Sequence, residues 1–190
     1  MEHLSLARAF AEMVHAKHTY ADGPYTNHLD EVEQILADAG MGTVRDRIIA
    51  RLHDSIEDVD PLLTKMAQDF IFTNFGFSIY GVVWALSGFG HNRKARNQHA
   101  YEKIARYPEA ADYKVADRIA NFGAAIRGMI TDERKLKKAN MYAKEDAIFR
   151  DNVVSHATNQ KLIERYDALI GQHHAITVEM QLYKAAHEAA

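Results

Sequence analysis

The segment 52–58 gathers ionisable side chains between apolar ones. It reads Leu-His-Asp-Ser-Ile-Glu-Asp, so His53, Asp54, Glu57 and Asp58 fall within six residues. On a helix, residues four apart share a face, which would place His53 over Glu57 and Asp54 over Asp58. An imidazole beside carboxylates is a mixed ligand set suited to manganese, iron or zinc. The segment is therefore a candidate metal site.

The same segment also has an ordinary interpretation. A single His-Asp pair is expected by chance in a chain with 11 histidines, and its charges could form a solvated helix face. Against this, Leu52 and Ile56 flank the cluster and indicate a largely buried helix. Buried charges there would need a metal ion or charged partners. The segment alone does not decide between the two interpretations.

Two further segments carry polar groups that could join such a site. A Gly-Pro turn leads into a predicted helix whose first turn carries His28. The segment 114–121, Lys-Val-Ala-Asp-Arg-Ile-Ala-Asn, places Asp117 and an asparagine one helical turn apart. His28 could be an ordinary histidine, and Asp117 could be a carboxylate neutralised by Lys114 or Arg118. Neither segment is decisive by itself.

The order of the three segments resembles a known family. A histidine after Pro-Tyr, then Leu-His-Asp-x-x-Glu-Asp, then Lys-x-Ala-Asp-x-x-x-Asn is similar to the hydrolase domain of the RelA/SpoT family and its small single-domain relatives. Those metal-dependent enzymes of the HD superfamily remove the 3′-pyrophosphate from the alarmone (p)ppGpp. The similarity runs over 9–149, and Phe75-Gly76 adds a fainter match. It implies an all-α, single-domain HD-type helical bundle over 1–190, acting as a stand-alone hydrolase.

The resemblance also assigns roles to matching residues. It implies that one divalent ion, usually manganese, is held by His28, His53, Asp54 and Asp117. Glu57 and Asp58 would lie beside the attacking water, one taking its proton and the other protonating the leaving oxygen. A bound ion would lower the pKa of water and offset phosphoryl charge. Asn121 would meet the sugar, and Lys138 with Tyr142 would face phosphate.

A nucleotide with several phosphates needs cations beyond one metal ion. Arg93, Lys94 and Arg96 form the densest basic cluster in the middle of the chain, in a predicted loop after Gly88 and Gly90. We expect this loop, and Arg93 and Arg96 in particular, to approach the phosphates. A solvated basic loop is the equally open alternative.

The chain departs from the family pattern where the family holds its substrate. Many members carry an Arg-Lys pair five and four residues before the proline of Pro-Tyr, whereas this chain has Thr19 and Tyr20. Tyr20 could stack on a base, but the charge is absent. Ala124 stands where the family often has threonine. These departures bear on the identity of the nucleotide more than on phosphohydrolysis.

Alternative functions therefore stay open beside (p)ppGpp hydrolysis. One is an HD phosphohydrolase acting on another purine nucleotide or on a phosphorylated dinucleotide cofactor. Another is a non-catalytic nucleotide sensor, although a sensor has no need for Glu57 and Asp58 together. A helical scaffold without a small-molecule site would make the three-part motif a coincidence.

Composition narrows the class of protein. The 190 residues have the size of one domain, 47% are hydrophobic, and no cysteine is present, which excludes thiolate sites and fits a cytoplasmic location. A net charge of −3 gives no electrostatic case for nucleic-acid binding. We expect no signal peptide, and we interpret the apolar stretch 70–89, which polar residues interrupt, as buried protein and not as a membrane span. Oligomerisation is possible but cannot be predicted from the sequence.

The spacing of apolar residues is helical throughout. The first helix contains Leu6 and Phe10, the second runs from His28 to about Gly40, and the third follows the candidate N-cap Thr43 and continues past Ile56. Further helices are predicted near 61–74, 77–87, 96–106, 110–128, 133–155 and 158–187. The β-branched and aromatic content of 70–86 would also suit a strand, but no partner strand is evident. The sequence predicts an all-α fold.

Overall fold

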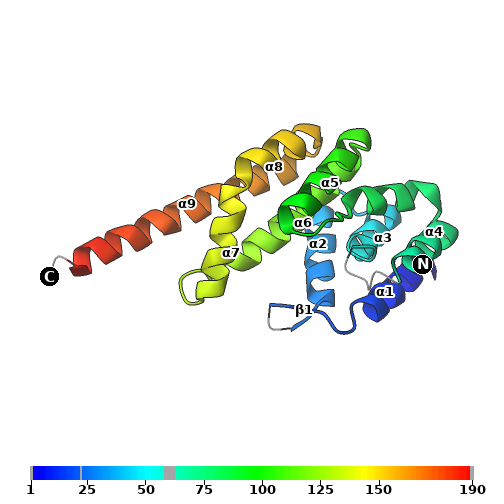
Figure 1. Cartoon of the computed structure of the whole chain (residues 1–190), viewed down its shortest axis with the longest axis horizontal. Helices are drawn as coiled ribbons and strands as arrows, with labels where there is room; N and C mark the ends of the chain where they lie inside the picture. The colour runs from blue at the N-terminus through cyan, green and yellow to red at the C-terminus, as the bar shows by residue number, and fades with distance from the viewer. Residues whose placement is uncertain (1, 22, 58–62, 189–190) are drawn as a thin grey trace.

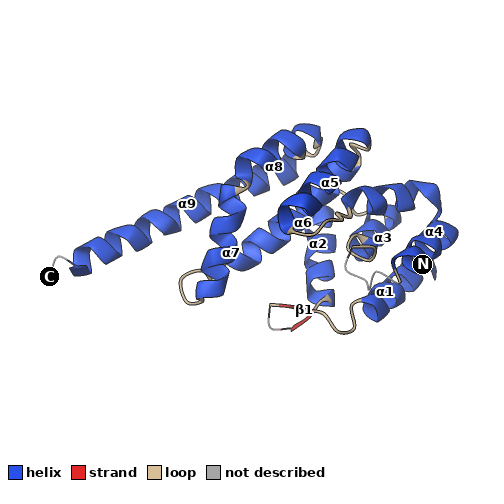
Figure 2. Ribbon diagram, in the orientation of Figure 1, coloured by secondary structure: helices blue, strands red, loops and turns tan. Residues whose placement is uncertain are grey.

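The chain folds almost entirely into helices, as predicted (Figures 1 and 2). The structure is a computed structural model that describes residues 2–21, 23–57 and 63–188. In chain order its elements are α1 (Glu2–Val14), β1 (Thr19–Tyr20), β2 (Gly23–Pro24), α2 (Thr26–Asp38), α3 (Val44–Leu52), α4 (Thr64–Leu86), α5 (Arg93–Arg106), α6 (Ala110–Ile126), α7 (Glu133–Lys144), α8 (Asp146–Asn152), a 3₁₀ helix (Val154–His156) and α9 (Gln160–Glu188). The all-α prediction is confirmed for the described residues. Asp58 and the predicted helix start at Pro61 lie outside them.

The helix α6 lies at the centre of the fold and contacts α2, α4, α7 and α9. It is buried along its whole length, from Ala110 at its start to Ile126 at its end. A helix that is buried all round is typical of the middle of a helical domain, and its alanines favour helix formation. Asp117 sits midway along this helix with 9% of its surface exposed. Its carboxylate is therefore placed inside the fold. The helix α9 packs against α6 and extends beyond the other helices towards its C-terminal end (Figure 1).

A short hairpin lies where the sequence predicts only a turn. Thr19 pairs with Pro24, and Tyr20 pairs with Gly23, in antiparallel register. Strands of two residues carry no alternating pattern long enough to recognise, so the sequence does not predict this pair. The hairpin sets the Tyr20 ring against His28, with ring centroids 4.8 Å apart.

The helix α3 begins as predicted but ends earlier. Thr43 is its N-cap and forms a capping box with Asp46, whose backbone N–H donates to the Thr43 hydroxyl at 3.2 Å. The last helical residue is Leu52, and 53–57 form a turn in which the Ser55 N–H donates to the Leu52 carbonyl at 2.9 Å. The predicted stacking of Glu57 over His53 on one continuous helix is therefore wrong. The flanking apolar residues are nevertheless fully buried, as expected.

The apolar stretch around 70–86 is helical and not a strand. It forms α4, which changes direction at Gly76, where φ is 77° and ψ is 174°. Glycine adopts such a positive φ without steric penalty, which agrees with the predicted break there. By length and composition α4 could cross a membrane, a test that core helices of soluble proteins also pass. Ile71, Val82 and Val83 are fully buried, so we interpret α4 as a core helix.

The basic cluster at 93–96 does not form the predicted loop. The Asn92 side chain accepts a hydrogen bond from the Ala95 N–H at 2.9 Å and caps α5. Arg93, Lys94 and Arg96 consequently lie in the first turn of that helix. Their positions are fixed by helical geometry.

The predicted single helix over 133–155 is also wrong. It divides at Glu145 into α7, α8 and the short 3₁₀ helix. The Glu145 carboxylate accepts hydrogen bonds from Arg93 at 2.7 and 3.0 Å, and Arg118 lies 3.2 Å away. These partners are distant in sequence, so no local pattern marks the division.

Candidate active site

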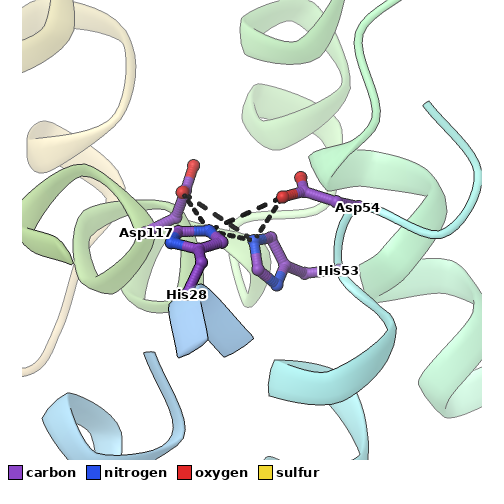
Figure 3. A group of neighbouring side chains, drawn as sticks. All are labelled: His28, His53, Asp54 and Asp117. Carbon is purple, nitrogen blue, oxygen red and sulfur yellow. Dashed lines mark hydrogen bonds and ion pairs between the residues drawn. The ribbon is translucent and has the colours of Figure 1, made fainter. Parts of the chain in front are cut away.

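Three separate parts of the fold bring four potential ligands together (Figure 3). His28 comes from the first turn of α2, His53 and Asp54 follow α3, and Asp117 comes from α6. One ligand atom of each residue lies within 4.8 Å of the others. The structure thus assembles all four residues that the sequence predicts as metal ligands.

The geometry of this cluster suits a divalent ion. The two Nε2 atoms of His28 and His53 are 3.2 Å apart, and His53 Nε2 lies 2.9 Å from Asp54 Oδ2. The other ring nitrogen of His53 is 2.8 Å from the Ala50 carbonyl. That contact holds a proton on Nδ1 and leaves Nε2 as the ring nitrogen that faces the cluster. Two imidazole nitrogens and two carboxylates are a donor set for a transition metal ion.

Electrostatics in the cluster favour ionised groups. Burial opposes ionisation of Asp117, yet Lys114 and the two imidazoles hold the pKa of its carboxyl well below its usual range. Burial disfavours the charged form of His53, but Asp54 and Asp117 together raise its pKa well above that of a free histidine. The ionised carboxylates thus favour protonated imidazoles in the metal-free cluster. A bound ion would displace these protons from the imidazoles. Metal binding should release protons and strengthen with rising pH.

Tyr25 supports one of the candidate ligands. Its hydroxyl donates a hydrogen bond to Asp54 Oδ2, and its ring stacks on His15 with centroids 4.4 Å apart. A hydrogen bond of this kind orients a carboxylate toward the ion. Replacing Tyr25 by Phe should therefore weaken metal affinity about 10-fold, measured by calorimetric titration of the metal-free protein. Tyr183→Phe is the matched control because that tyrosine is 66% exposed; equal affinities in both variants would contradict the assignment.

The buried histidine behind Tyr25 should make stability depend on pH. Burial lowers the pKa of His15 from 6.5 to about 4, against a smaller raising effect of Asp54. Below pH 6.5 the unfolded chain therefore binds a proton at His15 that the folded chain does not bind. The free energy of unfolding consequently falls as pH drops from 6.5 towards 4. This group alone should remove about 2 kcal/mol of unfolding free energy between pH 7 and pH 5.

Urea unfolding with chelator tests this linkage. His15→Asn keeps a hydrogen-bonding atom near the position of Nδ1, which contacts His18 at 3.0 Å. The variant should lose less stability than the unmodified protein on going from pH 7 to pH 5. Parallel losses in the two proteins would contradict a neutral buried His15.

Glu57 reaches the site from the turn after α3. Its Oε2 accepts the Gly88 N–H at 2.7 Å, and Arg96 Nε lies 3.7 Å from Oε1. Burial raises the pKa of the Glu57 carboxyl, while Lys114 and the Gly88 N–H oppose that rise. A carboxylate with a raised pKa is better suited to accept a proton than an ordinary surface glutamate. Asp58, predicted as its partner, lies outside the described residues.

A cavity of about 470 Å³ opens beside the cluster. Its lining includes Asp54, Glu57 and Asp117 from the centre of the site. It also includes every residue predicted to contact substrate, namely Tyr20, Arg93, Arg96, Asn121, Lys138 and Tyr142. Polar groups dominate its wall, which suits the charge-assisted hydrogen bonds of a phosphorylated ligand.

The cations around the cavity are already partly paired. Arg93 and Arg118 share Glu145 and both lie over the Tyr142 ring, 5.2 and 4.8 Å from its centroid. Lys138 Nζ contacts the neutral amide of Asn121 at 3.4 Å. Among the described residues, no carboxylate lies within salt-bridge distance of Lys138, so its charge is suited to an incoming anionic group.

Lys114 and Arg118 also line the cavity, although neither was predicted to contact substrate. Lys114 Nζ lies 3.1 Å from Asp117 Oδ2, which settles its open role as the ion-pair partner of that carboxylate. Arg118, the other possible partner, pairs with Glu145 instead. The signal for Lys114 was present in its spacing, three residues before Asp117 on one helix. No local sequence pattern indicates that the Arg118 side chain pairs with Glu145.

Comparisons with known proteins place the fold. Neither a protein-family model nor a curated protein matches the sequence. The solved structure of a metazoan ortholog of SpoT, described as hydrolysing ppGpp and playing a role in starvation responses, is similar to this one with a TM-score of 0.69. The match has 22% sequence identity and covers 90% of this chain and 96% of that chain. The chain thus has the helical fold of this SpoT ortholog, in agreement with the resemblance in its motifs.

Proposed function

We propose that the protein is a metal-dependent phosphohydrolase that removes the 3′-pyrophosphate of (p)ppGpp, giving GDP or GTP and pyrophosphate. The observation that carries the proposal is the convergence of His28, His53, Asp54 and Asp117 beside a polar, cation-lined cavity. The fold shared with a protein described as hydrolysing ppGpp supports the same substrate class. A single catalytic domain in the cytoplasm belongs to this proposal.

The cluster would hold one divalent ion, for which we propose manganese. When bound, such an ion offsets negative charge on phosphoryl oxygens and makes water more acidic. Glu57 takes the proton of the attacking water, and the Gly88 N–H holds its carboxylate in place at 2.7 Å. Asp58 is proposed to protonate the leaving oxygen; the reverse assignment of the two acids is also open.

The cavity residues would then bind different parts of the substrate. Lys114 and Arg96 lie next to the reacting centre and would offset charge on the transferred phosphates. Lys138 and Arg93 stand beside Tyr142 and would face the more distant phosphate. Asn121, bound to Asp117 Oδ1 at 2.7 Å, would meet the sugar.

A second candidate function rests on the hairpin. Thr19 and Tyr20 line the cavity where the resembling family carries an Arg-Lys pair. The Tyr20 hydroxyl donates to the Ala120 carbonyl at 3.0 Å, so its ring is anchored and can offer one flat face to a base. This wall offers an aromatic face where the resembling family offers an Arg-Lys pair, with the Lys138 ammonium group 6.0 Å from the Tyr20 ring centroid. It favours a phosphohydrolase for another purine nucleotide or a phosphorylated dinucleotide cofactor.

The products separate the two functions. We expect ppGpp incubated with the manganese-loaded protein to give GDP and pyrophosphate, and chelator to stop the reaction. Release of orthophosphate from another nucleotide, with ppGpp untouched, would support the second function. Absence of turnover with every phosphorylated nucleotide would favour the non-catalytic sensor.

A further inference from the structure

A buried lysine on α5 has no role in the site described so far. Lys103 is 3% exposed, and the described residues supply no carboxylate within salt-bridge distance of it. Its Nζ donates to the Trp84 carbonyl at 2.6 Å and also to the Ser87 carbonyl. It lies 4.6 Å from the centroid of the Trp84 ring. Carbonyl dipoles and an aromatic face thus replace the water that a buried ammonium group loses.

The Ser87 carbonyl belongs to the same peptide group as the Gly88 N–H. A trans peptide is planar, so its carbonyl and its N–H point in opposite directions. The Lys103 ammonium group donates to the carbonyl oxygen of this peptide group. Glu57 Oε2 accepts a hydrogen bond from its N–H at 2.7 Å. A cation on the carbonyl also polarises the peptide and strengthens its N–H as a donor. The orientation of one peptide group therefore links Lys103 to Glu57.

The rest of the loop is packed so that this peptide has little freedom. A Cβ added to Gly88 would meet the Arg96 carbonyl oxygen at 2.4 Å, so the loop lies directly against the first turn of α5. The Ser87 hydroxyl donates to the Val83 carbonyl at 2.8 Å and holds the loop to the end of α4. The peptide is fixed on one side by α5 and on the other by α4.

We propose that Lys103 is a positioning residue that, through the Ser87–Gly88 peptide, orients the Glu57 carboxylate toward the reacting centre. This inference rests on the proposed function only in assuming that Glu57 takes part in turnover. Glu57 also faces Lys114 from α6 and Arg96 from α5, and the carboxylates of Asp54 and Asp117 act on it from the cluster. Among the described residues, Lys103 thus joins Lys114 and Arg96 as a cation near Glu57, and it acts through the backbone.

The first test uses nuclear magnetic resonance on the metal-free protein and needs no turnover. In Lys103→Met, the Gly88 amide proton should move upfield and exchange with solvent about 10-fold faster or more, because its peptide is no longer pinned. The carboxyl carbon of Glu57 should titrate at a higher pH than in the unmodified protein, since the Gly88 N–H lowers its pKa. Lys65→Met, at an exposed lysine paired with Asp69, is the matched control and should change neither signal.

The second test is kinetic and uses the metal-loaded protein with the substrate that it turns over. Lys103→Met should lower kcat about 10- to 100-fold, a part of what a general base contributes, with metal affinity and KM within twofold. The acid limb of the kcat profile should shift to higher pH. If Lys103→Met does not fold, Lys103→Gln serves instead, because its amide keeps two N–H donors for the carbonyls and should give a smaller change of the same sign.

The outcomes separate this inference from the proposed function. An unchanged Gly88 amide and Glu57 titration in a folded variant would overturn the inference, whatever the substrate. An unchanged kcat beside a displaced Gly88 amide would overturn it as well. Failure to hydrolyse ppGpp would overturn the proposed function alone, since the resonance measurements still report whether Lys103 holds Glu57.

Discussion

The Asp117→Ala variant is expected to lose metal binding and turnover together. Asp117 is one of only two carboxylates in the four-ligand group, and its Oδ1 lies 3.3 Å from His28 Nε2. Its removal also leaves the Lys114 charge without the carboxylate 3.1 Å away. We expect kcat/KM to fall by 10³-fold or more, in line with removal of a metal's contribution to phosphoryl charge stabilisation.

Calorimetry with manganese and product release from ppGpp measure the two effects. Asp117→Asn keeps the size of the side chain and should fail in the same way, which separates loss of a ligand from loss of packing. Asp132→Ala is the matched control, because Asp132 caps α7 by accepting the Arg134 N–H at 2.8 Å and lies away from the cluster. It should cost about 1 kcal/mol of stability and leave turnover intact. Equal loss in both alanine variants would contradict the site.

Glu57→Gln should lower turnover strongly while leaving metal binding intact. Glu57 is outside the four-ligand group, so manganese affinity should stay within a few-fold of that of the unmodified protein. Glutamine keeps an oxygen for the Gly88 N–H but cannot take a proton from water at neutral pH. We expect kcat to fall by about 10²- to 10⁴-fold, the usual contribution of a positioned general base.

The pH profile gives an independent check on the same residue. A general base acts in its ionised form, and burial raises the pKa of Glu57 above that of an ordinary glutamate. Activity should therefore fall with decreasing pH at a higher pH than a free glutamate would give. Glu102→Gln, at an exposed residue that pairs with Gln98 at 2.9 Å, should keep both rate and profile. A Glu57→Gln variant with more than a third of the normal kcat would remove Glu57 from the mechanism.

The fold class follows from the spacing of apolar residues in the sequence. Apolar spacing repeats with helical period along the whole chain, and this local pattern is enough to specify helices because each turn buries the same face. The ligands His28, His53, Asp54 and Asp117 were nominated by the resemblance of their three motifs to a known family, because the motifs are specific only in combination. Capping residues fixed some boundaries as well, as Thr43 does for α3.

The tertiary structure decided how these parts meet. The division at Glu145 involves Arg93 and Arg118, which lie far from it in the chain. The same holds for Lys103, because its residue type does not predict that it binds the Ser87–Gly88 peptide. Local propensity cannot encode such contacts, since they exist only when helices from different parts of the sequence pack together. The convergence of α2, the turn after α3 and α6 therefore makes a site from residues that are 89 positions apart at their extremes, from His28 to Asp117 (117 − 28).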